Sequence, residues 1–217
     1  ALVRAFATSS DLQAASNLLV VVRGAPELEN SEAVLRSRDG LDETESEVLD
    51  EIVSVCETHN LWGKVSAFSL ASQNELAAAY RHLSQLHSVF ALTALYEPFG
   101  LAPLEAIAAG LPALVTRNGG PSESLYDEVT GQEYGVLVDP SDPGDIAAGL
   151  LRLVGPENEW DALRRAGRER VLARYTWDQT ATGYLAVIEG MLADRLPIPA
   201  YFLDPRPETD MGVEYLV

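Results

Sequence analysis

Glu97 and Glu105 stand eight positions apart, and their type and spacing suit a ligand that carries sugar hydroxyls at two places. Between them lies Gly100, where the absence of a Cβ lets a ligand approach the backbone. The amides of Phe99, Gly100 and Leu101 lead into a predicted helix N-terminus, which suits phosphate or sugar oxygens. A carboxylate accepts two hydrogen bonds from vicinal hydroxyls. The segment therefore fits a ligand with a sugar at each end and phosphate between them.

The pattern alone leaves a second interpretation of these residues open. Glu105 would then only favour the helix dipole, and Glu97 would be a solvated carboxylate. A glycine turn at residues 118–121, with the sequence Asn-Gly-Gly-Pro, is predicted to face the same edge of the sheet. By itself that turn is typical of an ordinary connection between a strand and a helix.

An alternation of strands and helices must position these loops, and it predicts an α/β domain with a parallel sheet. Ligands of open α/β sheets bind at the carboxyl ends of the strands, where the candidate loops lie. Such a sheet normally starts with a strand, whereas residues 1–8 have the pattern of a helix end, so we expect the first strand to be missing. The predicted strands span residues 17–22, 64–68, 88–92, 111–115 and 135–138.

Capping patterns and apolar periodicity predict the helices between the strands. Asp42 and Glu45 form a capping-box pattern at the start of one helix. Thr176 and Gln179 mark the start of the last long helix in the same way. Residues 25–41 are polar and are expected to be irregular. The remaining predicted helices span residues 74–86, 102–110, 142–154 and 157–173, with a short helix after Pro121, and the last helix ends near residue 194.

The composition describes an acidic protein large enough for one domain with a sizeable core. The chain has 217 residues, of which 47% are hydrophobic. Its 33 acids against 15 bases give a formal net charge of −18. Because no basic stripe is visible, the sequence argues against nucleic acid as a partner. An anionic ligand would need a local device, such as a helix N-terminus or a placed arginine.

Cysteine and histidine point to structural roles. Cys56 is the single cysteine, so no intrachain disulfide forms, and a reducing, cytoplasmic compartment is favoured. It falls on the apolar stripe of a predicted helix and is expected to be a buried thiol. His59, His82 and His87 fall on predicted helices or at their ends, and no spacing is typical of metal ligands. No apolar run reaches about 18 residues, so no membrane span is expected.

Four sequence blocks resemble a known family. They are E-P-F-G-L at residues 97–101 with Glu105, A-G-L-P at 109–112, T-R-N-G-G-P at 116–121 and G-V-L-V-D-P at 135–140. Together they resemble the donor lobe of retaining GT-B glycosyltransferases of the sucrose-synthase, glycogen-synthase and sucrose-phosphate-synthase type. The similarity runs over about residues 1–193. Residues 72–76 and 174–177 add to it.

The resemblance implies an architecture. The family has two Rossmann-like lobes with the active site in the cleft between them. This chain resembles the C-terminal lobe, which binds the nucleotide sugar. We expect that lobe at residues 1–195, without its first strand, followed by a proline-containing tail at residues 196–217.

The resemblance also assigns roles to the loop identified first. Glu105 would hold the ribose hydroxyls of UDP. Glu97 would be the catalytic residue at the donor hexose, near the reacting centre. The amides of Phe99, Gly100 and Leu101 would contact hexose hydroxyls and the diphosphate.

Further contacts to the donor come from two other segments. Leu70 and Gln73, in the stretch from 68 to 73, would border the uracil. Gly119 and Gly120 would shape the edge of the cleft. Family members need no metal to hold the diphosphate, because an arginine and a lysine do so, and no tightly bound cofactor is expected.

That arginine and lysine normally precede the stretch that begins at Ala1. Lys64 and Arg117 are not at the family's phosphate-binding positions, so this chain alone is expected to be inactive. The N-terminal lobe, which binds the sugar-phosphate acceptor, is absent as well. The intact enzyme would transfer glucose from UDP-glucose to fructose 6-phosphate, giving sucrose 6-phosphate with retention.

Two alternatives stay open. One is a related retaining glycosyltransferase with another donor or acceptor, because the residues for the acceptor lie in the other lobe. The other is a non-catalytic module that binds UDP-sugar or docks on a partner. A missing first strand would leave a sheet edge unpaired, which favours association. No membrane partner is expected in either case.

Overall fold

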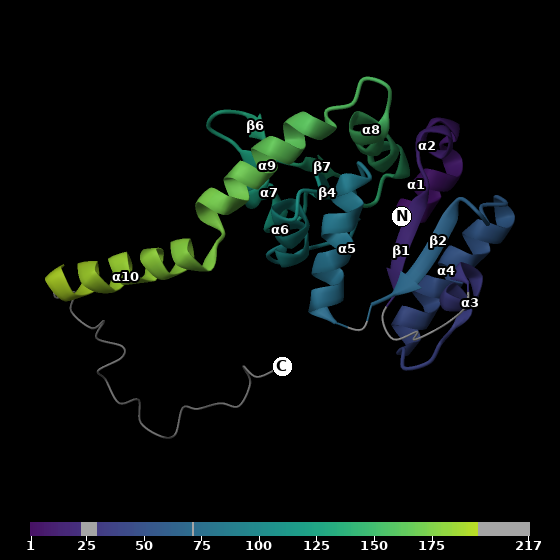
Figure 1. Cartoon of the computed structure of the whole chain (residues 1–217), viewed down its shortest axis with the longest axis horizontal. Helices are drawn as coiled ribbons and strands as arrows, with labels where there is room; N and C mark the ends of the chain where they lie inside the picture. Colours follow the sequence, from purple (N-terminus) through teal and green to yellow (C-terminus); the bar gives the residue numbers. More distant parts are fainter. Residues whose placement is uncertain (23–29, 71, 195–217) are drawn as a thin grey trace, which may run out of the picture. The chain divides into compact units, whose positions relative to one another are not determined.

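The structure is a computed structural model that describes residues 1–22, 30–70 and 72–194 (Figure 1). Its contacts divide the chain into two compact units, residues 1–175 and residues 176–217. The first unit carries all the strands named below, and the second contains the last helix, α10. The expected tail at residues 196–217 lies outside the described residues, and the boundary at residue 195 stays a prediction.

Among the described residues of the first unit, five parallel strands form, and they match the five predicted strands. β1 (Leu18–Val22) pairs with β2 (Val65–Ser69), with Leu18 opposite Val65. A three-stranded sheet has the order β3-β4-β7 and is also parallel throughout. Its strands are β3 (Phe90–Leu92), β4 (Ala113–Thr116) and β7 (Val136–Val138). The predicted class, a Rossmann-like parallel α/β fold, is therefore confirmed.

The parallel strands form two sheets rather than one. A classic doubly wound sheet has the strand order 3-2-1-4-5-6, in which the first strand separates the two halves. In that order, β1 and β2 correspond to strands 2 and 3, and β3, β4 and β7 correspond to strands 4, 5 and 6. Strand 1, which would lie between β1 and β3, has no counterpart among the described strands. β1 and β3 therefore have no shared neighbour, and Figure 1 shows the labelled strands as two groups, β1 with β2 and β4 with β7.

Within the described residues, no strand pairs with the second edge of β1. The Leu18 N–H donates to the Lys64 carbonyl on the β2 side. Because strand residues alternate in direction, the backbone groups of Leu19 and Val21 point to the opposite edge. Their side chains are 41% and 50% exposed, which is unusual for a parallel sheet, since such sheets are normally covered on both faces.

Ten helices are described, and most begin where the sequence predicts. The Asp42 carboxylate accepts from the Glu45 N–H at 2.8 Å, and the Glu45 carboxylate accepts from the Asp42 N–H at 3.1 Å, which confirms the capping box. The Gln179 N–H donates to the Thr176 hydroxyl at 3.3 Å, at the start of the last helix. The helices are α1 (Leu2–Thr8), α2 (Ser10–Ala15), α3 (Ser31–Arg36), α4 (Glu43–Thr58), α5 (Gln73–Gln85), α6 (Leu101–Ala108), α7 (Pro121–Ser124), α8 (Pro143–Val154), α9 (Trp160–Arg174) and α10 (Trp177–Asp194).

Three short elements were not predicted. α2 follows α1 directly, with Ser9 as its N-cap. The expectation that residues 25–41 are irregular is wrong for α3, although residues 23–29 lie outside the described residues. An antiparallel hairpin joins β5 (Tyr126–Asp127) and β6 (Gln132–Glu133). Elements this short carry too few residues for a periodic apolar pattern, so local side-chain caps determine them instead.

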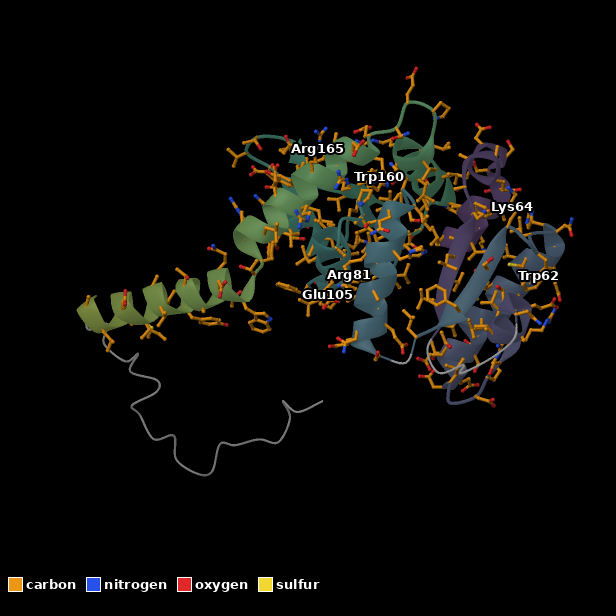
Figure 2. All side chains as sticks on the ribbon, in the orientation of Figure 1. Trp62, Lys64, Arg81, Glu105, Trp160 and Arg165 are labelled. Carbon is orange, nitrogen blue, oxygen red and sulfur yellow. The ribbon has the colours of Figure 1, made fainter. Side chains whose placement is uncertain are left out.

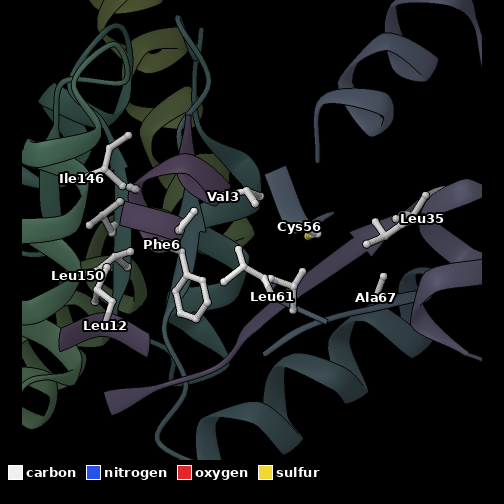
Figure 3. Close-up of a cluster of buried hydrophobic side chains, with 14 of the residues drawn as sticks. Val3, Phe6, Leu12, Leu35, Cys56, Leu61, Ala67, Ile146 and Leu150 are labelled. Atoms are coloured by element: carbon white, nitrogen blue, oxygen red, sulfur yellow. The ribbon is translucent and has the colours of Figure 1, made fainter. Parts of the chain in front are cut away.

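A large apolar core joins the first helices to both parallel sheets. Phe6 of α1 is 2% exposed, and it belongs to the same cluster as Leu114 of β4 and Ile146 of α8. Figure 3 shows Phe6 near Leu150 and Leu12, with Leu61 beside it. α1 and α2 pack against α8, so the beginning of the chain is held by the β7 half of the unit.

Cys56 lies in this core and is completely buried, as predicted. Burial raises the pKa of the Cys56 thiol, and the negative charge of Glu57 adds to that rise. The thiol is therefore a packing residue. Within the described residues, no helix combines the length and apolar character needed to cross a membrane.

Candidate functional site

The loop after β3 and the turn after β4 lie against each other at the carboxyl ends of neighbouring strands. The backbone of Glu97 forms a parallel bridge with that of Gly119. The Glu97 N–H donates to the Asn118 carbonyl at 3.0 Å, and the Gly120 N–H donates to the Glu97 carbonyl at 3.0 Å. The prediction that the loop and the glycine turn face the same edge is confirmed.

Glycine is required at this contact for steric reasons. A Cβ on Gly119 would lie 2.2 Å from the Glu97 carbonyl oxygen, and a Cβ on Gly120 would lie 2.5 Å from that of Phe99. Gly119 has φ +100° and Gly100 has φ +93°, values that favour glycine. These residues therefore allow two backbone segments to touch.

The Glu97 side chain folds back onto its own loop. One of its carboxylate oxygens, Oε1, accepts from the Gly100 N–H at 2.8 Å and from the Phe99 N–H at 3.4 Å. Gly100 is the N-cap of α6 and has no side chain with which to cap the helix, so Glu97 supplies the acceptor. Two of the three amides that the sequence predicts as ligand contacts are thus engaged by Glu97. The third, that of Leu101, begins α6.

Glu105 lies one turn further along α6 with its side chain exposed. Figure 2 shows it on the side of α6 that faces α5, and these two helices pack together. Burial raises the pKa of Tyr80 on α5, and the charge of Glu105 contributes to that rise. Glu105 is therefore open to solvent, as a ligand contact requires.

The two predicted uracil contacts lie on a different sheet. Leu70 follows β2 directly and is half-buried, and Gln73 is the exposed first residue of α5. These contacts thus gather Glu97, its loop and the glycine turn at the β3–β4 sheet, with Glu105 following on α6. Leu70 and Gln73 belong to the carboxyl end of the β1–β2 sheet.

A surface hollow of about 450 Å³ adjoins the loop and the turn. Three predicted residues line it: Phe99, Gly119 and Gly120. The sequence interpretation missed Tyr96 and Tyr175, which also line it. Tyr96 is 65% exposed and directly precedes Glu97, so its place in the loop was an available signal. Exposed rings of this kind offer apolar faces to a sugar or a base. The remaining lining residues are Pro98, Ser122, Glu123 and Ser124.

The cations named from the sequence are engaged elsewhere. The Lys64 ammonium donates to the Gln13 carbonyl at 2.8 Å. The Arg117 guanidinium lies 2.6 Å from an Asp145 carboxylate oxygen, which also accepts from the Asp139 N–H. Both cations therefore contact other groups of the chain itself.

The histidines take the structural positions that were predicted. His59 is the C-cap of α4, His82 lies in the last turn of α5, and His87 follows that helix. The His87 ring lies 4.7 Å from the ring of Trp160. In the part of the chain that the structure describes, no group of three or more His, Cys, Asp or Glu side chains could hold a metal ion.

Comparison with known proteins identifies similar sequences and similar folds. Sucrose-phosphate synthase of Zea mays is 34% identical over 181 residues, which are 82% of this chain and 16% of that protein. The solved sucrose-phosphate synthase of Thermosynechococcus elongatus superposes with a TM-score of 0.64 at 25% identity, over 89% of this chain and 42% of that one. Anabaena HepE, solved in complex with UDP, gives a TM-score of 0.63 at 15% identity, over 87% and 44%.

The chain thus spans less than half of each of these relatives. The expected fold, one lobe of a GT-B glycosyltransferase of the sucrose-phosphate-synthase type, agrees with that partial coverage. The match to the family described as glycosyl transferases group 1 extends from residue 2 to residue 170. The chain therefore belongs to the glycosyl transferases of group 1.

Proposed function

We propose that this chain is the donor-binding lobe of a sucrose-phosphate-synthase-type glycosyltransferase and that it binds UDP-glucose. One observation carries the proposal. The loop that bears Glu97 lies on the glycine turn at the carboxyl ends of β3 and β4, and it leads into a helix that presents Glu105 to solvent. Ligands of open α/β sheets bind at this edge. The sucrose-phosphate synthase relatives support this choice of substrate.

A different glutamate of the chain contacts each end of the donor. Glu105 accepts from the ribose hydroxyls, and Glu97 accepts from the hexose. Because the Phe99 and Gly100 amides now donate to Glu97, the ligand either shares them or displaces the carboxylate from them. The Leu101 amide completes the set at the start of α6.

The uracil end and the rim of the site come from the other segments. Leu70 and Gln73 border the uracil, and they reach it from the β1–β2 side. Gly119 and Gly120 form the rim of the site, where the hollow of about 450 Å³ begins. No metal is needed in this proposal, because an arginine and a lysine hold the diphosphate in the family that the chain resembles.

The intact enzyme transfers the glucosyl group to fructose 6-phosphate. The bond between the anomeric carbon and the UDP oxygen breaks, a bond to an acceptor hydroxyl forms on the same face, and that hydroxyl's proton is lost. Sucrose 6-phosphate and UDP result, with retained configuration. Lys64 and Arg117 contact other groups of the chain and do not match the family's phosphate-binding positions, so we expect the departing UDP to lack the arginine and lysine that stabilise it in the family. At about 10²- to 10³-fold for each missing group, the chain alone is slower by about four to six orders of magnitude.

Binding of UDP to the chain, measured by calorimetry at fixed salt, tests this proposal. Glu105→Ala should weaken UDP binding by about 10- to 100-fold, the usual effect of losing a charged hydrogen-bond acceptor. Glu169→Ala is the matched control, because Glu169 is an exposed glutamate on α9. Equal affinities for the wild type and Glu105→Ala would contradict the assignment. If the intact enzyme is active with another acceptor and inactive with fructose 6-phosphate, the proposed acceptor is wrong and the chain belongs to a related retaining glycosyltransferase.

The open edge of β1 favours a second candidate function, a module that pairs with another polypeptide. Val21 of β1 is 50% exposed, and within the described residues no strand pairs with the second edge of β1, which can accept a further strand. Val21→Lys should then reduce association of the chain in light scattering. Val48→Lys is the control, since Val48 is 53% exposed on α4 and lies on no strand. Equal association of both variants and the wild type would rule this candidate out.

A further inference from the structure

The turn at residues 118–120 holds both backbone groups of Glu97. The Asn118 carbonyl accepts from the Glu97 N–H at 3.0 Å, and the Gly120 N–H donates to the Glu97 carbonyl at 3.0 Å. The Asn118 side chain adds a third bond, because its Nδ2 donates to the Leu95 carbonyl at 2.8 Å. The backbone from which the Glu97 carboxylate projects is therefore fixed by a turn about 20 residues later in the sequence.

Asn118 is itself anchored to the core. Its N–H donates to the Thr116 hydroxyl at 3.2 Å, and Thr116 ends β4 with no exposed surface. On the other side of the turn, the Ser122 hydroxyl donates to the Gly119 carbonyl at 2.7 Å. A continuous series of contacts thus runs from a buried strand end, through Asn118, to the Glu97 loop.

The fit between the turn and the loop allows little adjustment. The atoms closest to a Cβ on Gly119 or Gly120 are backbone oxygens, at 2.2 Å and 2.5 Å, and not the ends of flexible side chains. A loop in backbone contact with a turn follows any shift of that turn. The Asn118 side chain is the polar group that joins the turn to the loop upstream of Glu97.

We propose that Asn118 is a positioning residue for the hexose end of the donor site. It acts through Leu95 and Glu97, and this inference rests on the proposed donor-binding function. Glu105 lies inside the regular helix α6, so the ribose end does not depend on the Asn118 side chain. Loss of that side chain should therefore weaken UDP-glucose binding more than UDP binding.

The test compares Asn118→Ala and Asn118→Leu with Asn158→Ala. Alanine removes the side chain, and leucine keeps much of its volume without a donor. Asn158 is the matched control, because its Nδ2 also donates to a backbone carbonyl, that of Gly155, at 2.9 Å. Two quantities are measured for each protein: the dissociation constants for UDP and UDP-glucose by calorimetry, and the amide hydrogen exchange of Glu97 and Gly120 by NMR without ligand.

The expected result is a split between the two ligands. UDP-glucose binding should weaken by about 2- to 10-fold in both Asn118 variants, the effect of one neutral hydrogen bond, and UDP binding should weaken less. The Glu97 and Gly120 amides should exchange faster by a similar factor, and Asn158→Ala should change neither quantity.

Three results would overturn the inference: equal weakening of both ligands, wild-type exchange at both amides, or equal affinity of the wild type for UDP and UDP-glucose. A wild type that binds neither ligand would instead refute the proposed function. The exchange rates would still show whether Asn118 orders Glu97.

Discussion

Replacing Gly119 by alanine should destabilise the first unit through two separate effects. Gly119 has φ +100°, and an L-residue in a left-handed conformation costs about 1–2 kcal/mol. Its new Cβ would also lie 2.2 Å from the Glu97 carbonyl oxygen and 3.3 Å from the Tyr96 ring. Overpacking of this kind costs about 1–3 kcal/mol. Together the two effects should lower the free energy of unfolding by about 2–5 kcal/mol.

A second glycine separates the two effects. Gly63 has φ +93°, and a Cβ there would meet no atom within 4 Å, so Gly63→Ala carries the conformational cost alone. Urea unfolding of both variants, followed by far-UV circular dichroism, gives the comparison. The free energy of unfolding of Gly119→Ala should be lower than that of Gly63→Ala by about 1–3 kcal/mol. A difference within about 0.5 kcal/mol would refute the claim that the turn and the Glu97 loop are in rigid backbone contact.

Three further predictions concern the cap, the buried thiol and the hairpin. Glu97→Ala removes the acceptor for the Gly100 N–H and should lower stability by about 1 kcal/mol in urea unfolding, whereas Glu97→Gln, which keeps an acceptor oxygen, should lose less. Because the pKa of Cys56 is raised, the contribution of the thiol to stability is present below the usual pKa of 9.0 and is lost as the pH rises above it. Urea unfolding from pH 7 to 10 should show a fall in the free energy of unfolding that Cys56→Ala lacks. The hydrogen bond from the Thr130 N–H, foremost among several groups, lowers the pKa of Asp127. The contribution of Asp127 to stability is therefore present above the usual pKa of 3.8 and is lost as the pH falls through the lowered pKa. Asp127→Asn should reduce the loss of stability at acid pH, measured by urea unfolding.

Elements that side chains mark locally could be predicted from the sequence. The capping box of Asp42 and Glu45 fixes the start of α4 through bonds within four residues, so its signal is entirely local. β4 has four consecutive buried residues, Ala113–Thr116, which is the pattern of a strand covered on both faces. In both cases the residues that determine the element are the residues of the element itself.

Short elements and the split of the sheet could not be predicted in the same way. α3 buries only Val34 and Leu35, and two residues do not establish a helical period. The hairpin strands have two residues each and depend on the Asp127 carboxylate, which accepts from the Val129 and Thr130 amides. The separation of β1 from β3 follows from strand order, a tertiary property that the pattern of each strand does not carry.

The site was predictable in its residues but not in its internal bonds. The spacing of Glu97 and Glu105 identified the loop, and the glycine turn was expected at the same edge. That Glu97 caps its own helix depends on the positive φ of Gly100 and on backbone bonds to Asn118. Tyr175 was missed because only the fold brings it to the hollow beside that loop.

The most direct test of donor binding follows individual amides while ligand is added. The chain, labelled with ¹⁵N, is titrated with UDP-glucose, and the amide shifts of Phe99, Gly100 and Leu101 are recorded together with the Glu105 side-chain carboxyl shift from a ¹³C-labelled sample. We expect all four signals to move along saturating curves with one dissociation constant. If these signals stay in place, or if shifts saturate only at residues far from this loop, the chain does not bind its donor as proposed.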